Sequence, residues 1–103
     1  MQMDAGLDTG DMLIKAETEI GENMTAGELH DKLSMLGAEV MSKTIKKIID
    51  GTLEREKQDD SLSDYAPMLS KELCPVDWTK SAEEIHNQVR GLSPWPIATS
   101  VLN

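Results

Sequence analysis

Several residue types are scarce in this sequence. Its 103 residues include no phenylalanine, one tyrosine, two tryptophans and a single cysteine, Cys74. A lone cysteine excludes an internal disulfide framework and favours a reducing compartment. No apolar run approaches the roughly 18–20 residues of a membrane helix, and the first residues lack the basic and apolar regions of a secretory signal. We therefore expect a cytoplasmic protein that does not contact the membrane.

Basic residues are also few. Ten lysines and arginines stand against 19 acidic residues, for a formal net charge of −9. Phosphate recognition requires a basic surface, so we expect no nucleic-acid footprint on this stretch itself. Asp4, Asp8 and Asp11 do not have the alternate spacing of a calcium loop, so a solvated acidic turn is favoured over a metal site. A chain this short holds one small domain or parts of two.

The N-terminal half predicts one strand and one long helix. Residues 12–20 alternate with a period of two, which is typical of a strand with one buried face. Thr25 and Glu28 form a capping box that predicts the start of a helix over residues 25–50, and Gly51 suits the position just past its end. The apolar stripe of this helix consists of Leu29, Leu33, Leu36, Val40, Ile45 and Ile48. Such a helix is about 37 Å long, so we expect the stripe to pack on a sheet that is mostly absent from these residues.

The C-terminal half predicts a linker and a short helix. Residues 58–64 are polar and are interpreted as a linker. Ser81 and Glu84 form a second capping box, which predicts a helix over residues 82–92. The prolines that follow stop this helix, because proline disfavours helical geometry in the residue before it.

The strongest local signal for a site is the tetrapeptide Leu7-Asp8-Thr9-Gly10. A carboxylate in a tight turn can be held by backbone amides, and glycine allows a ligand to approach closely. An ordinary Asp-rich β-turn remains the alternative. Asp-Thr-Gly is also the signature of aspartic proteases, but the long central helix and the lack of a glycine-rich flap pattern argue against that class.

The order of segments resembles the methionyl-tRNA formyltransferase family. The matching segments are Met3–Leu13, Thr25–Leu33 with Leu36–Ala38, Tyr65–Glu72, Val76–Trp78 and Ala82–Pro96. The resemblance runs over essentially the whole chain. It implies an α/β fold class: a fragment of a Rossmann-like formyltransferase domain with a strand and a long helix, then a linker and the first helix of a C-terminal β-barrel domain. The implied divisions are residues 1–57, the C-terminal part of the catalytic domain, 58–67, the linker, and 68–103, the beginning of the tRNA-binding barrel-type domain.

The resemblance also implies a reaction. The family transfers a formyl group from 10-formyltetrahydrofolate to the α-amine of methionyl-initiator tRNA, for translation initiation, without a metal, and the full-length enzyme is expected to be monomeric. Asp8 matches the catalytic aspartate, and Ala5, Gly6 and Leu7 match positions near the pterin of the folate. The family's Asn-x-His and Ser-Leu-Leu-Pro motifs do not occur in this sequence. His30 and His86 lie on the expected helices and are not spaced like that pair. We therefore expect this chain by itself to be inactive.

Two other functions remain open. A related formyltransferase acting on a nucleotide sugar, or a formyl-folate hydrolase, shares the aspartate turn, whereas residues 65–96 favour the tRNA enzyme. A stand-alone acidic helical module could instead bind a partner protein through the Leu29–Ile48 stripe. Such a module would have to hide the stripe within itself or oligomerise.

Overall fold

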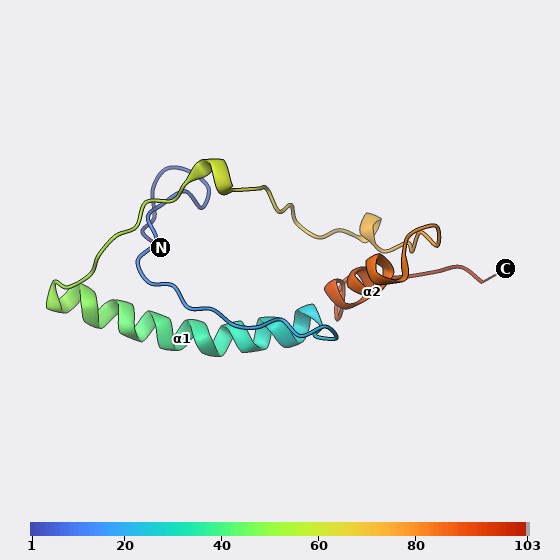
Figure 1. Ribbon diagram of the computed structural model, residues 1–103, viewed down its shortest axis with the longest axis horizontal. Coiled ribbons are helices and arrows are strands. Elements are labelled where there is room, and N and C mark those ends of the chain that lie inside the picture. Colours follow the sequence, from blue (N-terminus) through green and yellow to red (C-terminus); the bar gives the residue numbers. More distant parts are fainter. Residues whose placement is uncertain (103) are drawn as a thin grey trace. The chain divides into compact units, whose positions relative to one another are not determined.

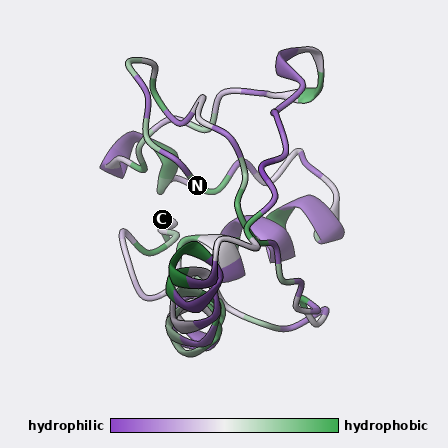
Figure 2. Cartoon of the chain, turned by 90° about the vertical axis from the view of Figure 1, so that its left-hand side faces the viewer, coloured by the Kyte–Doolittle hydropathy of each residue, from purple (hydrophilic) through white to green (hydrophobic). Residues whose placement is uncertain are grey.

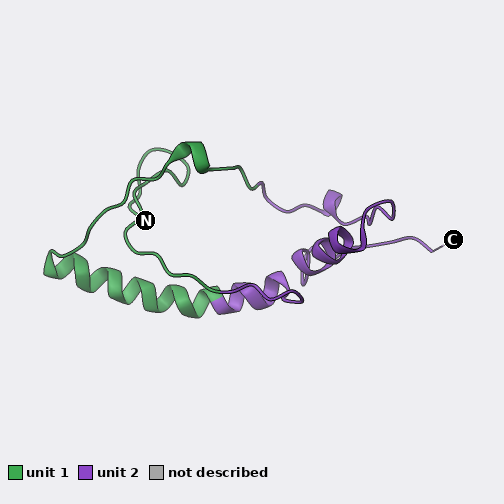
Figure 3. Cartoon of the chain, in the orientation of Figure 1, with its two compact units in different colours: residues 1–18, 33–66 green, residues 19–32, 67–103 purple. Residues whose placement is uncertain are grey.

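The computed structural model describes residues 1–102, and helices are its only regular elements (Figure 1). They are α1 (Ala26–Asp50), the short 3₁₀ helices η1 (Asp60–Leu62) and η2 (Lys71–Leu73), and α2 (Ala82–Gly91). The chain divides into two compact units (Figure 3). Unit 1 comprises Met1–Thr18 and Leu33–Ala66, and unit 2 comprises Glu19–Lys32 and Pro67–Asn103.

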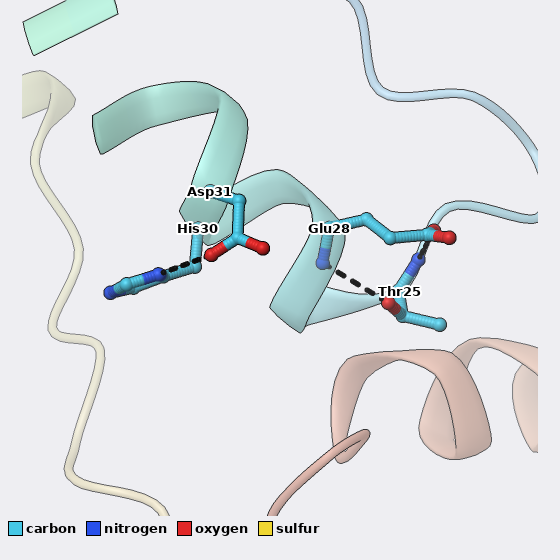
Figure 4. A network of polar contacts seen from close by, with 4 residues as sticks. All are labelled: Thr25, Glu28, His30 and Asp31. Carbon is cyan, nitrogen blue, oxygen red and sulfur yellow. Dashed lines mark hydrogen bonds and ion pairs between the residues drawn. The ribbon is translucent and has the colours of Figure 1, made fainter. Parts of the chain in front are cut away.

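Helix α1 begins and ends where the sequence predicts. The Thr25 amide donates to Glu28 Oε2 at 2.9 Å, and the Glu28 amide donates to Thr25 Oγ1 at 3.2 Å, so the capping box is complete (Figure 4). Gly51 adopts a φ of 68°, and its amide donates to the Ile48 carbonyl at 3.2 Å. A further bond from Thr52 N to Lys47 O at 3.0 Å completes a glycine-terminated C-cap. The helix prediction is confirmed.

The apolar stripe of α1 is only partly covered by the described residues. Hydrophobic and hydrophilic positions recur along the helix (Figure 2). Leu33, Ile45 and Ile48 are exposed, at 47%, 49% and 54% of their possible surface, and the other three stripe residues are half-buried. Thr44 is the only buried residue of α1, and its hydroxyl donates to the Val40 carbonyl at 2.7 Å. The stripe therefore exists as predicted, and three of its six residues remain exposed among residues 1–102.

The predicted strand over residues 12–20 does not form. Within residues 1–102, this segment pairs only at Met12, in an isolated antiparallel bridge with Glu56. The bridge consists of Met12 N to Glu56 O at 2.8 Å and Glu56 N to Met12 O at 2.9 Å. A strand is defined by its hydrogen-bonded neighbours, and residues 13–20 find none among the described residues. The Rossmann strand and the barrel of the expected α/β class are thus not seen in this helix-rich structure.

Unit 2 carries the second predicted helix. Helix α2 starts at its capping box as expected and ends at Gly91, one residue earlier than predicted. Its His86 Nε2 lies 2.9 Å from the Glu22 carbonyl, and Arg90 Nη1 donates to the carbonyls of Gly21 and Met24, both at 3.2 Å. These contacts hold α2 against the turn that precedes α1.

The buried interior is very small. Only two apolar residues of the described chain are buried, Cys74 and Leu92, at 6% and 5% exposure, and both belong to unit 2. Among residues 1–102, no side chain falls below 2% exposure. Cys74 Sγ lies 3.6 Å from the Pro96 carbonyl, which accounts for the thiol as a packing residue. Among residues 1–102, no helix has both the length and the apolar character needed to cross a membrane.

The capping box of α2 makes the helix sensitive to acid. Hydrogen bonds from the Ser81 amide (2.9 Å) and hydroxyl (2.8 Å) to Glu84 Oε2 lower the pKa of Glu84 from its ordinary value of 4.5. A lowered folded-state pKa means that the stabilisation is present above pH 4.5 and is lost as the pH falls through the folded value. We expect amide protection in α2 to weaken below pH 4.5 in hydrogen-exchange measurements.

Glu84→Gln is the matched control for this effect. Glutamine keeps an acceptor oxygen for the Ser81 amide but does not titrate, so the acid-dependent loss of protection in α2 should disappear. An equally steep loss in the variant would show that another group is responsible. Ser81→Ala, which removes the N-cap hydroxyl, should cost about 1 kcal/mol of helix stability at neutral pH.

Candidate functional site

The Asp8 turn is organised by the side chain of Asp4. Asp4 Oδ1 accepts a hydrogen bond from the Gly6 amide at 3.0 Å and from Thr9 Oγ1 at 2.6 Å. This arrangement folds residues 4–9 into a local turn of the kind that aspartate side chains stabilise. The Asp4 carboxylate therefore stabilises the turn through these two hydrogen bonds. Among residues 1–102, no group of three or more metal-ligating side chains is found.

Asp8 itself adopts a left-handed backbone conformation, with a φ of 54°. For an L-residue other than glycine this conformation costs about 1–2 kcal/mol, and aspartate and asparagine tolerate it best. The Asp8 side chain is exposed, and its carboxylate makes no hydrogen bond to another residue of the described chain. The turn thus presents a carboxylate outward on a backbone that must be held in place by neighbouring groups.

Gly10 is the closest-packed point of the turn. It is buried, and a Cβ placed on it would lie 1.5 Å from the Gln2 carbonyl oxygen and 2.7 Å from the Gln2 carbonyl carbon. The Gln2 amide donates to the Asp11 carbonyl at 2.8 Å, so the N-terminal residues lie directly against the turn. Only glycine fits at position 10 without displacing this backbone.

The predicted site residues are consecutive and lie together. Ala5, Gly6, Leu7 and Asp8 are all exposed, and Leu7 retains 81% of its surface. A small cavity of about 130 Å³ lies at the turn. Its lining residues are Met1, Met3, Asp4, Gly6, Leu7, Asp8, Thr9 and Gly10. Gly6, Leu7 and Asp8 therefore line the same small cavity, whereas Ala5 does not.

One residue at the turn was not found by the sequence analysis. Gln58 is half-buried, and its side-chain Nε2 donates to the Asp8 carbonyl at 2.8 Å and to the Gly10 carbonyl at 2.6 Å. The sequence placed Gln58 at the start of a polar linker. The available signal was register: an antiparallel pair in which Met12 faces Glu56 places residue 58 opposite residue 10.

The two histidines lie on the two α-helices, as the sequence predicts. His30 is exposed on α1, where its Nδ1 lies 3.3 Å from the Asp31 carboxylate (Figure 4). His86 contacts the Glu22 carbonyl within unit 2.

Comparison with known proteins adds a second kind of observation. Residues 68–103 match the family described as formyl transferase, C-terminal domain. The chain is also 59% identical, over 98 residues and 95% of its length, to the methionyl-tRNA formyltransferase of Acetivibrio thermocellus. Nearly the whole chain is thus similar to part of a methionyl-tRNA formyltransferase.

Other relatives match the chain from end to end. The methionyl-tRNA formyltransferases of Ruminiclostridium cellulolyticum and Geobacter sulfurreducens are 53% and 55% identical to it over all 103 residues. The chain spans only about one third of the length of these relatives, 32–33% in the three cases. This coverage agrees with the expectation that the chain corresponds to part of a formyltransferase.

Proposed function

We propose that this chain forms part of an enzyme that transfers a formyl group from 10-formyltetrahydrofolate to the α-amine of methionyl-initiator tRNA in the cytoplasm. The observation that carries the proposal is the 53–59% identity, over 95–100% of the chain, to proteins named methionyl-tRNA formyltransferase. In this proposal residues 1–57 complete the Rossmann-like catalytic domain, 58–67 form the linker and 68–103 begin the barrel-type domain. The match of residues 68–103 to the C-terminal domain family supports the last of these divisions.

The reaction requires two proton movements and one charge to be stabilised. The amine nitrogen attacks the formyl carbon and forms a tetrahedral intermediate, and the bond from that carbon to N10 of the folate then breaks. The amine loses a proton, the folate nitrogen gains one, and the developing oxyanion needs hydrogen-bond donors. Asp8 is proposed to act in the proton movements beside a histidine of the Asn-x-His motif, which this sequence lacks. A carboxylate next to an imidazole favours its protonated form.

The turn residues are proposed to lie next to the folate. Ala5, Gly6 and Leu7 present exposed backbone beside Asp8, and backbone amides and carbonyls can pair with the donors and acceptors of a pterin. Because half of the α1 stripe is exposed, the alternative of a stand-alone interaction module would require oligomerisation to cover the stripe. Helix α1 is better accounted for as an element that the rest of a larger enzyme covers.

A chimera tests the proposed function. In it, the 98-residue region of the A. thermocellus enzyme that aligns with this chain is replaced by the residues of this chain. We expect the chimera to formylate methionyl-tRNA with a kcat/KM within about tenfold of the parent enzyme, a difference of about 1.4 kcal/mol in transition-state stabilisation. The 103-residue chain alone should show no transfer, because it lacks the remaining catalytic motifs.

The identity of the formyl acceptor distinguishes the proposed function from that of a sugar-nucleotide formyltransferase or a formyl-folate hydrolase. The same chimera is assayed with an amino sugar nucleotide in place of methionyl-tRNA, and with no acceptor, so that folate hydrolysis is measured as well. A folded chimera that has lost transfer to methionyl-tRNA but gained transfer to the sugar, or only hydrolysis, would refute the tRNA assignment for this segment.

A further inference from the structure

The side chain of Gln58 bridges the two carbonyls that flank Thr9. Its Nε2 donates to Asp8 O at 2.8 Å and to Gly10 O at 2.6 Å, and it also lies 3.5 Å from Met1 Sδ. The partners are about 50 residues apart along the chain, and all belong to unit 1. The sequence predicts that Gln58 belongs to a polar linker, yet its side chain contacts the turn that carries Asp8. This contact needs a functional or structural explanation.

The chemistry of the contact is specific to an amide. A glutamine NH₂ group has two hydrogens, and here two carbonyl oxygens separated by one residue receive them. Neither carbonyl has another donor among residues 1–102. A glutamate at this position would offer only acceptors at neutral pH and would face the two carbonyls without a hydrogen to share.

Gln58 is itself fixed on both sides. Two residues before it, Glu56 exchanges both backbone hydrogen bonds with Met12. On its other side, the Asp59 carboxylate caps η1 by accepting from the Ser61 amide at 3.0 Å and hydroxyl at 2.6 Å. The backbone on both sides of Gln58 is therefore held by its own hydrogen bonds, which restricts where the side-chain amide of Gln58 can meet the turn.

The held segment includes the unusual backbone of Asp8. The Asp8 carbonyl that Gln58 binds belongs to the residue whose φ is 54°, and the direction of the Asp8 side chain follows from that backbone. We propose that Gln58 is a positioning residue that sets the direction of the Asp8 carboxylate through the carbonyls of Asp8 and Gly10. This inference rests on the proposed function, in which Asp8 takes part in formyl transfer.

The chain offers a matched control for this contact. In unit 2, Gln88 Nε2 also bridges two carbonyls, those of Leu73 and Pro75, at 2.9 and 3.1 Å. Gln58→Ala and Gln88→Ala thus remove the same side-chain amide, and each loses two hydrogen bonds to backbone carbonyls, one pair at the Asp8 turn and one pair elsewhere. Gln58→Ala also loses the weaker contact with Met1 Sδ. Any effect shared by both variants is structural, and any effect confined to Gln58→Ala belongs to the turn.

The experiment measures kcat and KM for formyl transfer in the chimera. We expect Gln58→Ala to lower kcat by about 10- to 100-fold, the scale of a misplaced catalytic group, with the KM for methionyl-tRNA changed less than about threefold. Gln88→Ala should keep kcat within about threefold. Gln58→Glu, which is nearly isosteric but lacks both donors, should reproduce the loss of Gln58→Ala even if the alanine variant folds poorly.

A double-mutant cycle separates the two proposals. With Asp8 replaced by asparagine, Gln58→Ala should add less than about threefold to the loss, because the group that it positions is gone. Equal kcat values for Gln58→Ala and Gln88→Ala, or full additivity with Asp8→Asn, would overturn the role of Gln58 and leave the proposed function intact. Normal turnover of Asp8→Asn itself would instead overturn the assigned role of Asp8, and the role of Gln58 with it.

Discussion

Replacement of Asp8 by alanine in the chimera is expected to lower kcat/KM for formyl transfer at least about 100-fold, the scale of losing a group that takes part in proton transfer. The nearly isosteric Asp8→Asn should cost a similar factor, because it removes the charge and keeps the volume. Asparagine also tolerates the left-handed backbone seen at this position, with its φ of 54°, so the turn should persist. The measurement is steady-state transfer to methionyl-tRNA, with thermal melts to verify that each variant is folded.

Asp11→Asn is the control for the loss of charge. It removes one carboxylate three residues further along the chain, and the backbone carbonyl that accepts from the Gln2 amide is retained. We expect its kcat/KM to stay within about threefold of the chimera, because the Asp11 carboxylate has no part in the proposed reaction. If Asp8→Asn were no more damaging than Asp11→Asn, Asp8 would have no part in the chemistry.

Gly10→Ala should open the Asp8 turn. The added methyl group would lie 1.5 Å from the Gln2 carbonyl oxygen, and a backbone atom cannot move aside as a flexible side chain can. Overpacking of this kind costs about 1–3 kcal/mol or more. In hydrogen-exchange measurements on the 103-residue chain, the protection of the Gln2 amide should fall about 10- to 100-fold. In the chimera, kcat should fall about 100-fold because Asp8 is displaced.

Gly37→Ala is the control for this substitution, and it is expected to stabilise the chain rather than destabilise it. Gly37 lies within α1, and a Cβ there meets nothing within 4 Å beyond the local helix backbone. Gly37→Ala should stabilise the helix of the 103-residue chain by about 0.5–1 kcal/mol, visible as an increase in helical circular dichroism. Retained protection of the Gln2 amide in Gly10→Ala would show that the N-terminal residues do not pack as described.

The helices could be predicted from the sequence because their signals are local. Each capping box consists of two residues three positions apart, and both boxes, Thr25 with Glu28 and Ser81 with Glu84, are present with the expected hydrogen bonds. The glycine end of α1 is equally local, since Gly51 alone accepts the left-handed conformation without strain. No partner outside the helix is needed to set these ends.

The strand over residues 12–20 could not be secured in the same way. A period of two identifies a face that suits burial, but a strand forms only when a neighbouring strand supplies hydrogen bonds. The described residues supply one such neighbour, Glu56, at one position. The pattern is therefore consistent with a strand in a larger sheet, as the relatives three times as long suggest, and the prediction remains untested in that setting.

The site shows the same division between local and distant information. The Asp4–Gly6–Thr9 turn follows from aspartate and glycine at close spacing, so the position of Asp8 in a turn could be anticipated. The contact of Gln58 with that turn depends on a pairing between segments some 50 residues apart. Composition identified residues 58–64 only as polar, and polarity does not show which side chain donates to which carbonyl.

The contacts of α2 have a consequence for dividing the gene. The sequence match to a domain family begins at residue 68, whereas the compact unit that contains this segment also includes Glu19–Lys32. A clone that started at residue 68 would deprive His86 and Arg90 of their carbonyl partners in residues 21–24, and would remove the Gly27 amide that donates to Ser93 O at 3.0 Å. A gene segment meant for recombination or for separate expression of this unit should therefore start near residue 19 and include α1. Starting it at the family boundary, residue 68, would remove these contacts.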